Sequence, residues 1–134
     1  MRTALDSSVL LCILRRQTGW EQWRGTLNRA AEEGVLLMSP VVFAECSVGF
    51  AHAEEARAQF DSLCIVYDPL TPECAFLAGQ VFLRYRREGG PRKHLIPDFL
   101  IAAHASTQAD RLAAMDRGYL RTYFPALPLL QPAG

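Results

Sequence analysis

The chain has 134 residues, a length that fits one ordinary domain with a hydrophobic core that needs no disulfide or structural metal. Half of the residues are apolar and 21% are charged, a balance that excludes a disordered or a membrane-spanning protein. The formal net charge is zero, so overall charge gives no sign of a nucleic-acid partner. We expect a single domain over residues 1–134.

The first part of the chain alternates short apolar runs with segments of helical periodicity. In chain order these are a strand at residues 2–5, helices at 7–14 and 20–33, a strand at 35–39, and a helix from Pro40 that carries Phe43, Glu45 and Cys46. Gly34 is the expected C-cap of the second helix, and Pro40 suits the first turn of the third. The pattern therefore predicts strands joined by helical crossovers.

The second part continues the alternation after residue 53. It contains a helix at residues 54–63, a strand at 64–67, a long helix at 71–87, a helix opened by Pro97 and Asp98, a strand at 111–115, and a final apolar stretch, LPLLQ. The Gly89-Gly90-Pro91 sequence breaks the chain after the long helix. Strands that alternate with helices favour a parallel sheet covered on both faces. We expect a three-layer α/β/α sandwich with a mostly parallel central sheet.

Acidic residues follow the predicted strands. Asp6 ends the first strand, Glu45 lies in the helix after the second, Asp98 opens a late helix, and Asp116 ends the fourth strand. In open sheets of this kind the ligand site lies beyond the carboxyl ends of the strands, so these four acids could converge. Clustered carboxylates repel one another unless a cation neutralises them, and oxygen ligands suit Mg²⁺ or Mn²⁺.

Each acid also has a simpler interpretation. Asp6 and Asp98 could cap helices, Glu45 could lie on a helix surface, and Asp116 could belong to a turn. Glu45 and Asp98, however, have neighbours too apolar for ordinary exposed acids. We expect them to be at least half-buried and to need a partner.

Four segments resemble the acidic motifs of PIN domains in the VapC toxin family: LDSSVLLCIL, SPVVFAECSVGF, IPDFLIAAHAS and MDRGYLRTYFP. They occur in the order of the family, and the likeness runs from Arg2 nearly to the C-terminus. One departure is Ala114, where many relatives have a threonine two positions before the last acid.

The resemblance implies a metal-dependent endoribonuclease, the toxin component of a type II toxin–antitoxin pair. Its acidic quartet would be Asp6, Glu45, Asp98 and Asp116, which would act in catalysis and hold one or two Mg²⁺ or Mn²⁺ ions. Ser7 matches a small hydroxyl residue that supports the site from behind the ligands. Hydrolysis would leave a 5′-phosphate and a 3′-hydroxyl.

The resemblance also implies a homodimer and a small cognate antitoxin whose tail fills the acidic groove. Trp20, Trp23, Phe50 and Phe60 are candidates for an apolar contact surface, with core packing as the simpler interpretation of each. We expect no membrane anchor and a cytoplasmic protein, because Asp6 and two serines interrupt what would be the core of a signal peptide.

Basic residues gather near the Gly-Gly-Pro break and before the C-terminus. Arg92 and Lys93 could hold the RNA backbone, with Arg117 as a phosphate contact beside the acids. A solvated loop is the simpler interpretation from charge alone. Replacing Arg92 and Lys93 with alanine tests the two interpretations through RNA affinity.

Other chemistries have weaker support. The cysteines Cys12, Cys46, Cys64 and Cys74 show no metal spacing and are expected to be small core residues, and His104 is expected to be a packed or surface helix residue. A receiver-like phosphoacceptor domain would need a lysine after a late strand, whereas the only lysine is Lys93. A dehalogenase-type phosphatase would need Asp-x-Asp. A non-catalytic RNA-binding or regulatory module on the same fold stays open.

Overall fold

The computed structural model describes residues 1–90, 96–115 and 118–133. Its strands are β1 (Arg2–Leu5), β2 (Val35–Met38), β3 (Ile65–Tyr67), β4 (Arg111–Ala113) and β5 (Leu129–Leu130). They form one sheet of order β3-β2-β1-β4-β5, in which every neighbouring pair is parallel. The carboxyl ends of all these strands therefore lie at one edge, with β1 at the centre.

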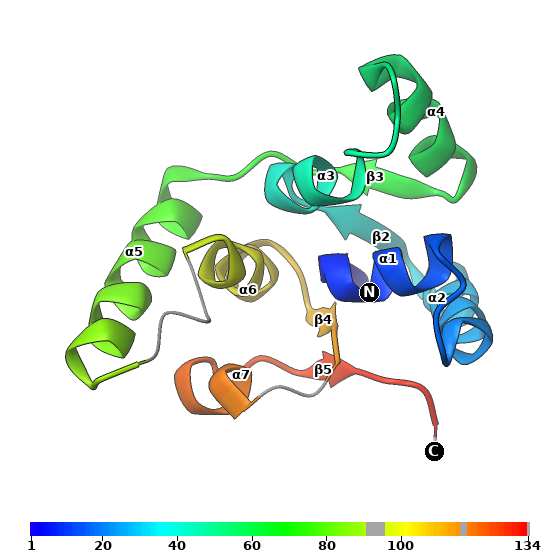
Figure 1. Cartoon of the computed structure of the whole chain (residues 1–134). Coiled ribbons are helices and arrows are strands. Elements are labelled where there is room, and N and C mark those ends of the chain that lie inside the picture. Colours follow the sequence, from blue (N-terminus) through cyan, green and yellow to red (C-terminus); the bar gives the residue numbers. More distant parts are fainter. Residues whose placement is uncertain (91–95, 116–117, 134) are drawn as a thin grey trace.

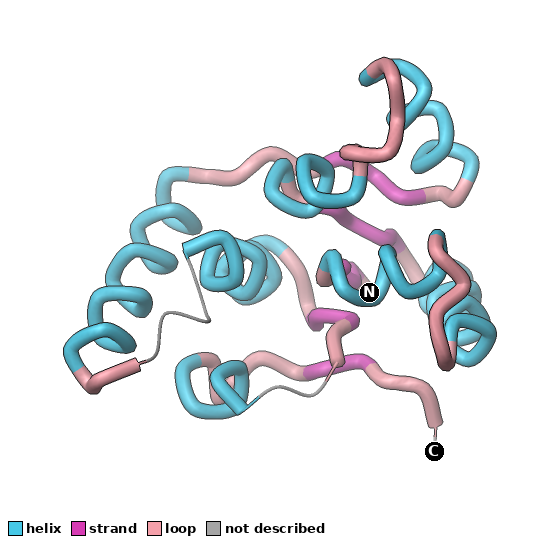
Figure 2. Tube along the Cα trace, in the orientation of Figure 1, coloured by secondary structure: helices cyan, strands magenta, loops and turns pink. Residues whose placement is uncertain are grey.

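Helices cover both faces of this sheet. They are α1 (Ser7–Leu14), α2 (Trp20–Glu33), α3 (Pro40–Cys46), α4 (Ala53–Ser62), α5 (Pro72–Arg87), α6 (Ile96–Gln108) and α7 (Gly118–Tyr123). Figures 1 and 2 show α1 and α2 on one side of the sheet and α6 on the other, with α5 packed along the outside of α6. The expected three-layer α/β/α sandwich with a parallel sheet is confirmed.

The central strand is apolar on both faces, as a strand covered by two helical layers must be. Thr3, Ala4 and Leu5 are all buried in β1. The hydroxyl of Thr3 accepts a hydrogen bond of 2.9 Å from Arg111 Nε on β4. This bond satisfies the one polar side chain of β1 that lies in the core.

The predicted elements are confirmed, with small shifts at their ends that have local causes. The strand predicted at residues 35–39 ends at Met38, because Ser39 is the N-cap of α3 and its Oγ accepts from the N–H of Val42 at 3.4 Å. The strand predicted at residues 111–115 ends at Ala113. No helix among the described residues is long and apolar enough to span a membrane.

Gly34 separates α2 from β2 at a point of close backbone contact. Its φ of 169° is an extended conformation, so a left-handed backbone is not what requires glycine here. A Cβ added at Gly34 would lie 1.9 Å from the carbonyl oxygen of Met1. That same carbonyl accepts from the N–H of Val35 at 3.0 Å. Glycine therefore lets the start of the chain pair with β2.

A cluster of aromatic side chains joins the helices on the α6 side. Phe99, which is fully buried in α6, lies 5.1 Å from the ring of Tyr85 on α5 and 5.5 Å from Tyr119 on α7. The ring of Phe82 on α5 lies 5.4 Å from the ring of Phe99. Because Phe99 follows Asp98 directly, this packing fixes the position of the first turn of α6.

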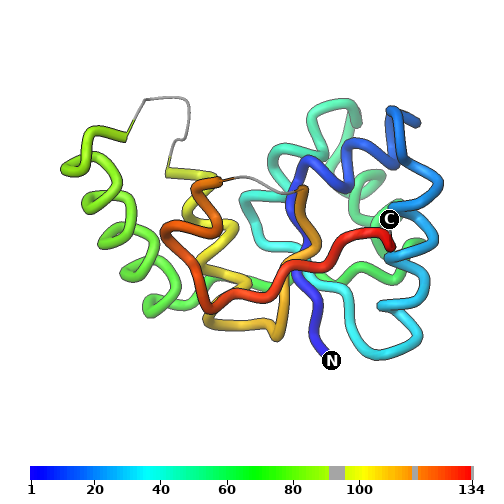
Figure 3. The backbone as a smooth tube through the Cα atoms, turned by 90° about the horizontal axis from the view of Figure 1, so that it is seen from below, coloured from blue at the N-terminus to red at the C-terminus, as the bar shows by residue number. Residues whose placement is uncertain are grey.

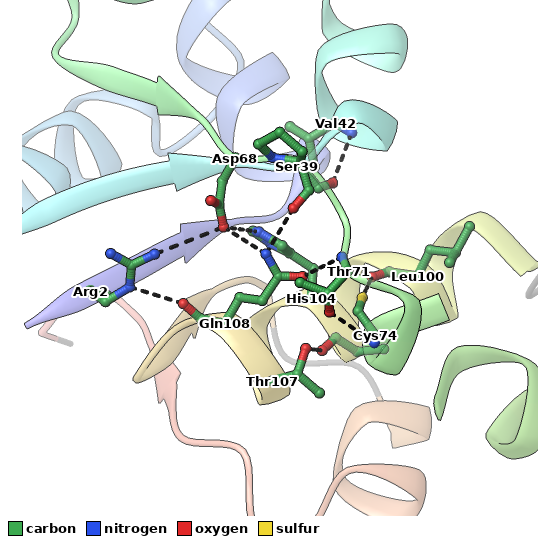
Figure 4. Close-up of polar contacts among 12 residues, drawn as sticks. Arg2, Ser39, Val42, Asp68, Thr71, Cys74, Leu100, His104, Thr107 and Gln108 are labelled. Atoms are coloured by element: carbon green, nitrogen blue, oxygen red, sulfur yellow. Dashed lines mark hydrogen bonds and ion pairs between the residues drawn. The ribbon is translucent and has the colours of Figure 1, made fainter. Parts of the chain in front are cut away.

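Four residues of distant segments meet in a polar cluster (Figure 4). His104 on α6 is 1% exposed, and its Nε2 lies 2.8 Å from Oδ2 of Asp68, which follows β3. Gln108 Nε2 donates to the same oxygen at 3.0 Å, and Arg2 Nη2 lies 3.9 Å from it. The prediction of His104 as a packed helix residue is confirmed, and its role is to tie α6 to the segment after β3.

Core packing explains some of the aromatic and cysteine residues but not all. Trp23 and Phe60 are buried, which confirms the simpler interpretation for these two. Trp20 and Phe50 are half-buried against the core. The prediction that all four cysteines are core residues is wrong for Cys64, which is exposed at the end of α4 and has a φ of +60°.

Candidate active site

Asp6 follows β1 at the centre of the carboxyl edge and is only 5% exposed. Its N–H donates to the carbonyl of Ala113 at the end of β4, at 3.0 Å, which places Asp6 beside the end of the neighbouring strand. Asp6 occupies the N-cap position of α1, but within this described turn its carboxylate caps no N–H of the helix. Asp6 is thus the N-cap residue in position, as the simpler interpretation expects, but its side chain does not act as the cap.

The hydroxyl of Ser8 donates to Oδ2 of the Asp6 carboxylate. Ser8 is one residue beyond the predicted supporting residue, Ser7. Sequence reasoning missed it, although a hydroxyl two positions after an acid at a helix start is a common local partner. The role of Ser7 stays a prediction, and its carbonyl oxygen lies 3.9 Å from Sγ of Cys46.

Glu45 lies in the last turn of α3 and is exposed, so the prediction that apolar neighbours would bury it is wrong. The apolar residues around it, such as Val42 and Cys46, face the core while Glu45 faces away. This is the ordinary consequence of helical periodicity in a short amphipathic helix.

The thiol of Cys46 lies near the charges of both Asp6 and Glu45. Burial raises the pKa of Cys46 to about 12, with further increases from the negative charges of Glu45 and Asp6. The charge of Arg15, at the end of α1, acts on the same thiol in the opposite direction and lowers its pKa. α1 and α3 pack against each other, so the two carboxylates lie on adjoining elements at this edge.

Asp98 lies in the first turn of α6, two residues after the helix begins at Ile96, and is half-buried. It is therefore inside the helix and not its N-cap. The positive end of the helix dipole favours a carboxylate at this position. α6 packs against β1, which precedes Asp6, and against α3, which carries Glu45.

The remaining predicted residues lie outside the described part of the chain. These are Asp116, Arg117, Arg92 and Lys93. Ala114 is fully buried directly after β4, and its carbonyl accepts from Nε2 of Gln131 at 3.2 Å. Because β4 is the neighbour of β1, the chain leaves the sheet next to Asp6 before it reaches residue 116.

The three described acids thus lie on elements that adjoin one another: Asp6 at the end of β1, Asp98 on α6, which packs on β1, and Glu45 on α3, which packs on α6. Among the described residues, no group of three or more His, Cys, Asp or Glu side chains is close enough to hold a metal ion. Figure 3 shows the carboxyl edge of the sheet at the top, where β1 passes into α1 and where α6 and α7 begin. Carboxylates in such a place can bind a hard cation or orient a water molecule.

Comparisons with known proteins agree with this arrangement. A model of the PIN domain family matches residues 3–125. The chain belongs to the PIN domain family. No curated protein matches it by sequence.

Several solved structures are similar along almost the whole chain. A chain of VapBC2 from Rickettsia felis, bound to a DNA fragment from its promoter, has a TM-score of 0.71 at 20% identity and covers 96% of this chain and 97% of its own. FitAcB from Neisseria gonorrhoeae has a TM-score of 0.66 at 21% identity, with 97% of both chains covered. VapBC-1 from nontypeable Haemophilus influenzae gives 0.70 at 17% identity and 96% coverage of both. At these identities the likeness shows the fold.

Proposed function

We propose that this protein is a metal-dependent endoribonuclease and the toxin component of a type II toxin–antitoxin pair. The observation that carries the proposal is the buried carboxylate of Asp6 at the centre of the carboxyl edge, with Glu45 and Asp98 on the adjoining helices. A buried carboxylate is costly to ionise unless hydrogen-bond donors or cations surround it, and the Ser8 hydroxyl is one such donor. A phosphodiester hydrolase that binds a cation at this edge accounts for an acid retained at this position.

The residues present fit a hard divalent cation by their chemistry. Asp6, Glu45 and Asp98 offer carboxylate oxygens. The thiol of Cys46, which lies near Asp6 and Glu45, has a raised pKa and is neutral, so it does not compete as a thiolate ligand. Such an oxygen donor set suits Mg²⁺ or Mn²⁺. When bound, the metal ion would supply Lewis-acid stabilisation of charge on the phosphate oxygens.

The protein's own residues would then act in three ways. Asp6, held by the Ser8 hydroxyl, is fixed in orientation at the end of β1. The dipole of α6 stabilises the negative charge of Asp98, and this carboxylate can accept a proton from an attacking water molecule. Glu45 would lie at the exposed rim of the site. Asp116 is proposed as the fourth acid. Attack by water on phosphorus leaves a 5′-phosphate and a 3′-hydroxyl.

The likeness to VapBC and FitAcB structures supports a small antitoxin partner. A homodimer and a cytoplasmic location are further parts of the same proposal. Arg92, Lys93 and Arg117 remain proposed RNA contacts. A non-catalytic RNA-binding module would keep the fold and the partner but would not cleave RNA.

Cleavage of a structured RNA transcript with Mn²⁺, and with excess chelator, tests the proposal. We expect cleavage with the metal ion, none with chelator, and products that a 5′-monophosphate-dependent exonuclease degrades. Asp6→Asn should abolish cleavage, whereas Asp61→Asn, an equal charge change on the exposed face of α4, should not. A parent protein that binds RNA but leaves it intact with Mn²⁺ would instead indicate the non-catalytic module.

A further inference from the structure

The turn between α1 and α2 carries a cluster of arginines around one tryptophan. Arg15 and Arg16 are exposed, Trp20 is the first residue of α2, and Arg24 is exposed one turn later. Between residues 15 and 24 the chain has three arginines and a single acid, Glu21. The elbow, defined as Arg16, Trp20 and Arg24, is therefore a local positive patch on a chain of zero net charge.

Both arginines of the elbow lie over the ring of the tryptophan at cation–π distance. The guanidinium carbon of Arg16 lies 5.3 Å from the Trp20 ring centroid, and that of Arg24 lies 5.0 Å from it. A guanidinium held by its planar face keeps its N–H edges available to phosphate oxygens. Within residues 1–90, 96–115 and 118–133, neither of these two arginines takes part in an ion pair.

The backbone holds the elbow in a defined shape. Gln17 N–H donates to the carbonyl of Cys12 at 2.9 Å, and Trp20 N–H donates to the carbonyl of Gln17 at 3.0 Å. Arg16 has a φ of +50°, a left-handed conformation that is unfavourable for a residue with a side chain. This turn therefore presents Arg16 at the cost of local backbone strain.

The elbow lies at the same end of the molecule as the acidic edge. α1 begins directly after Asp6 and ends before Arg15, so the backbones of Asp6 and Arg15 are on the order of 14 Å apart at about 1.5 Å per residue. Figure 3 shows α1 running along this end, away from α5, to the turn before α2. That length corresponds to about four stacked nucleotides at ~3.4 Å per phosphate of one strand.

We propose that Arg16 and Arg24, positioned by Trp20, bind the backbone and bases of single-stranded RNA that leads away from the acidic edge along α1. This inference rests on the proposed ribonuclease function for its substrate. Planar guanidinium groups suit this ligand because they pair with phosphates and also stack on unpaired bases. The contact is independent of base sequence and determines where the strand lies.

Fluorescence anisotropy with a labelled 12-nucleotide RNA of mixed sequence, in excess chelator so that no cleavage occurs, tests the contact. The variant is Arg16→Gly with Arg24→Ala; glycine removes the strain at residue 16 as well as the charge. We expect its Kd at low salt to rise about tenfold, and the slope of log K against log salt to fall by about 1.4, at about 0.7 for each lost phosphate contact.

Two further variants show whether the loss of RNA affinity depends on the number of positive charges or on their position beside Trp20. Arg29→Ala removes one exposed arginine from another face of the same helix, so its Kd and salt slope should match those of the parent. Arg24→Lys keeps the charge but loses planar stacking, so its salt slope should stay near that of the parent while its Kd rises. Melting temperatures of all variants show whether each protein is folded.

Trp20 provides a second readout that needs no loss of affinity. In a Trp23→Phe background the remaining tryptophan is Trp20, and RNA bound at the elbow should quench its emission. Unchanged emission on saturation, or a double variant with the Kd and salt slope of the parent, would overturn the proposal. So would a parent that does not bind the RNA.

The same variants distinguish an RNA contact from a protein contact. If RNA binding is unchanged but the double variant no longer co-purifies with the co-expressed product of an adjoining short gene, the elbow binds a protein and the proposal is wrong. If the parent binds RNA through the elbow but does not cleave it with Mn²⁺, the ribonuclease function fails while the RNA contact stands.

Discussion

Asp98 and Asp6 differ in what holds their negative charge, although both lie at the carboxyl edge. Asp6 is buried at the end of β1 and accepts from the Ser8 hydroxyl. Asp98 is half-buried in the first turn of α6, where the helix dipole favours it. Replacing Asp98 with asparagine removes a negative charge and keeps the shape of the side chain. The effect of this substitution on metal binding is easier to interpret than the same change at Asp6, which would also alter the hydrogen bond from Ser8.

Asp98→Asn should leave the chelated protein within about 1 kcal/mol of the parent in stability, because relief of carboxylate repulsion opposes the loss of about 0.3–1 kcal/mol of dipole interaction. The stabilisation that Mn²⁺ gives the parent should disappear, together with RNA cleavage. Thermal melting with chelator and with Mn²⁺ measures the first effect.

Glu55→Gln, on the exposed first turn of α4, is the matched control for the charge change. It should retain both the metal-dependent shift in melting temperature and cleavage. If Asp98→Asn also retains both, Asp98 is not a ligand, and the acidic site loses one of its three described members.

The thiols provide a prediction at the same scale. Cys64 is exposed, whereas Cys12, Cys46 and Cys74 are buried. Burial also raises the pKa of the Cys74 thiol, with a further increase from Asp68. A buried thiol with a raised pKa forms less of the nucleophilic thiolate at a given pH than an exposed thiol does, and burial also keeps reagents away from it.

Iodoacetamide on the native protein at pH 8 should therefore modify one cysteine, Cys64, as peptide mass spectrometry would show. Raising the pH to 10 should speed that reaction without adding Cys74. Because an unfolded thiol ionises near its ordinary value, stability from Cys74 is present below about pH 8.5 and falls as pH rises above it. Early modification of Cys74 would contradict its buried environment.

At the scale of elements, two glycines show opposite requirements. Gly34 faces the backbone of Met1, so Gly34→Ala must displace the start of β1 and should lower the free energy of unfolding by about 1–3 kcal/mol. Gly79 is exposed within α5 and has open space around it, so Gly79→Ala should raise that free energy by about 0.5–1 kcal/mol. Urea denaturation measures the change in unfolding free energy for both variants. A change of the same sign and size in the two variants would contradict the close contact at Gly34.

The polar cluster makes α6 depend on the segment after β3. Asp68→Ala leaves the buried His104 and the Gln108 amide without their shared acceptor, so we expect a loss of about 1–3 kcal/mol in unfolding free energy. Asp61→Ala on the exposed face of α4 should change it by less than about 0.5 kcal/mol. An unchanged urea midpoint for Asp68→Ala would show that the cluster adds nothing to stability.

For the whole molecule, the proposed homodimer has a direct measurement. Large apolar side chains remain exposed on the described surface, among them Val48 at 73% and Phe76 at 69%. Light scattering on the purified chain should give a mass twice the 14.9 kDa of one copy. A mass of one copy at micromolar concentration would contradict the homodimer and leave the nuclease proposal unaffected.

The local pattern was sufficient for much of this protein. Apolar periodicity predicted four of the five strands and six of the seven described helices to within two residues at most ends, because these signals depend only on neighbours along the chain; α7 was missed, and β5 was predicted only as an apolar stretch. It also placed Asp6 after the first strand and Asp98 in the first turn of a helix. A parallel sheet followed from the alternation itself, since parallel neighbours need crossovers.

Tertiary structure decided what depends on segments far apart in sequence. It set the strand order, which puts β4 beside β1 and so brings the chain before Asp116 next to Asp6. It also paired His104 with Asp68, 36 residues apart. Glu45 proved exposed despite apolar neighbours, because the orientation of α3 on its own core decides which residues face solvent. Periodicity describes one element at a time, whereas contacts between elements depend on how the layers pack.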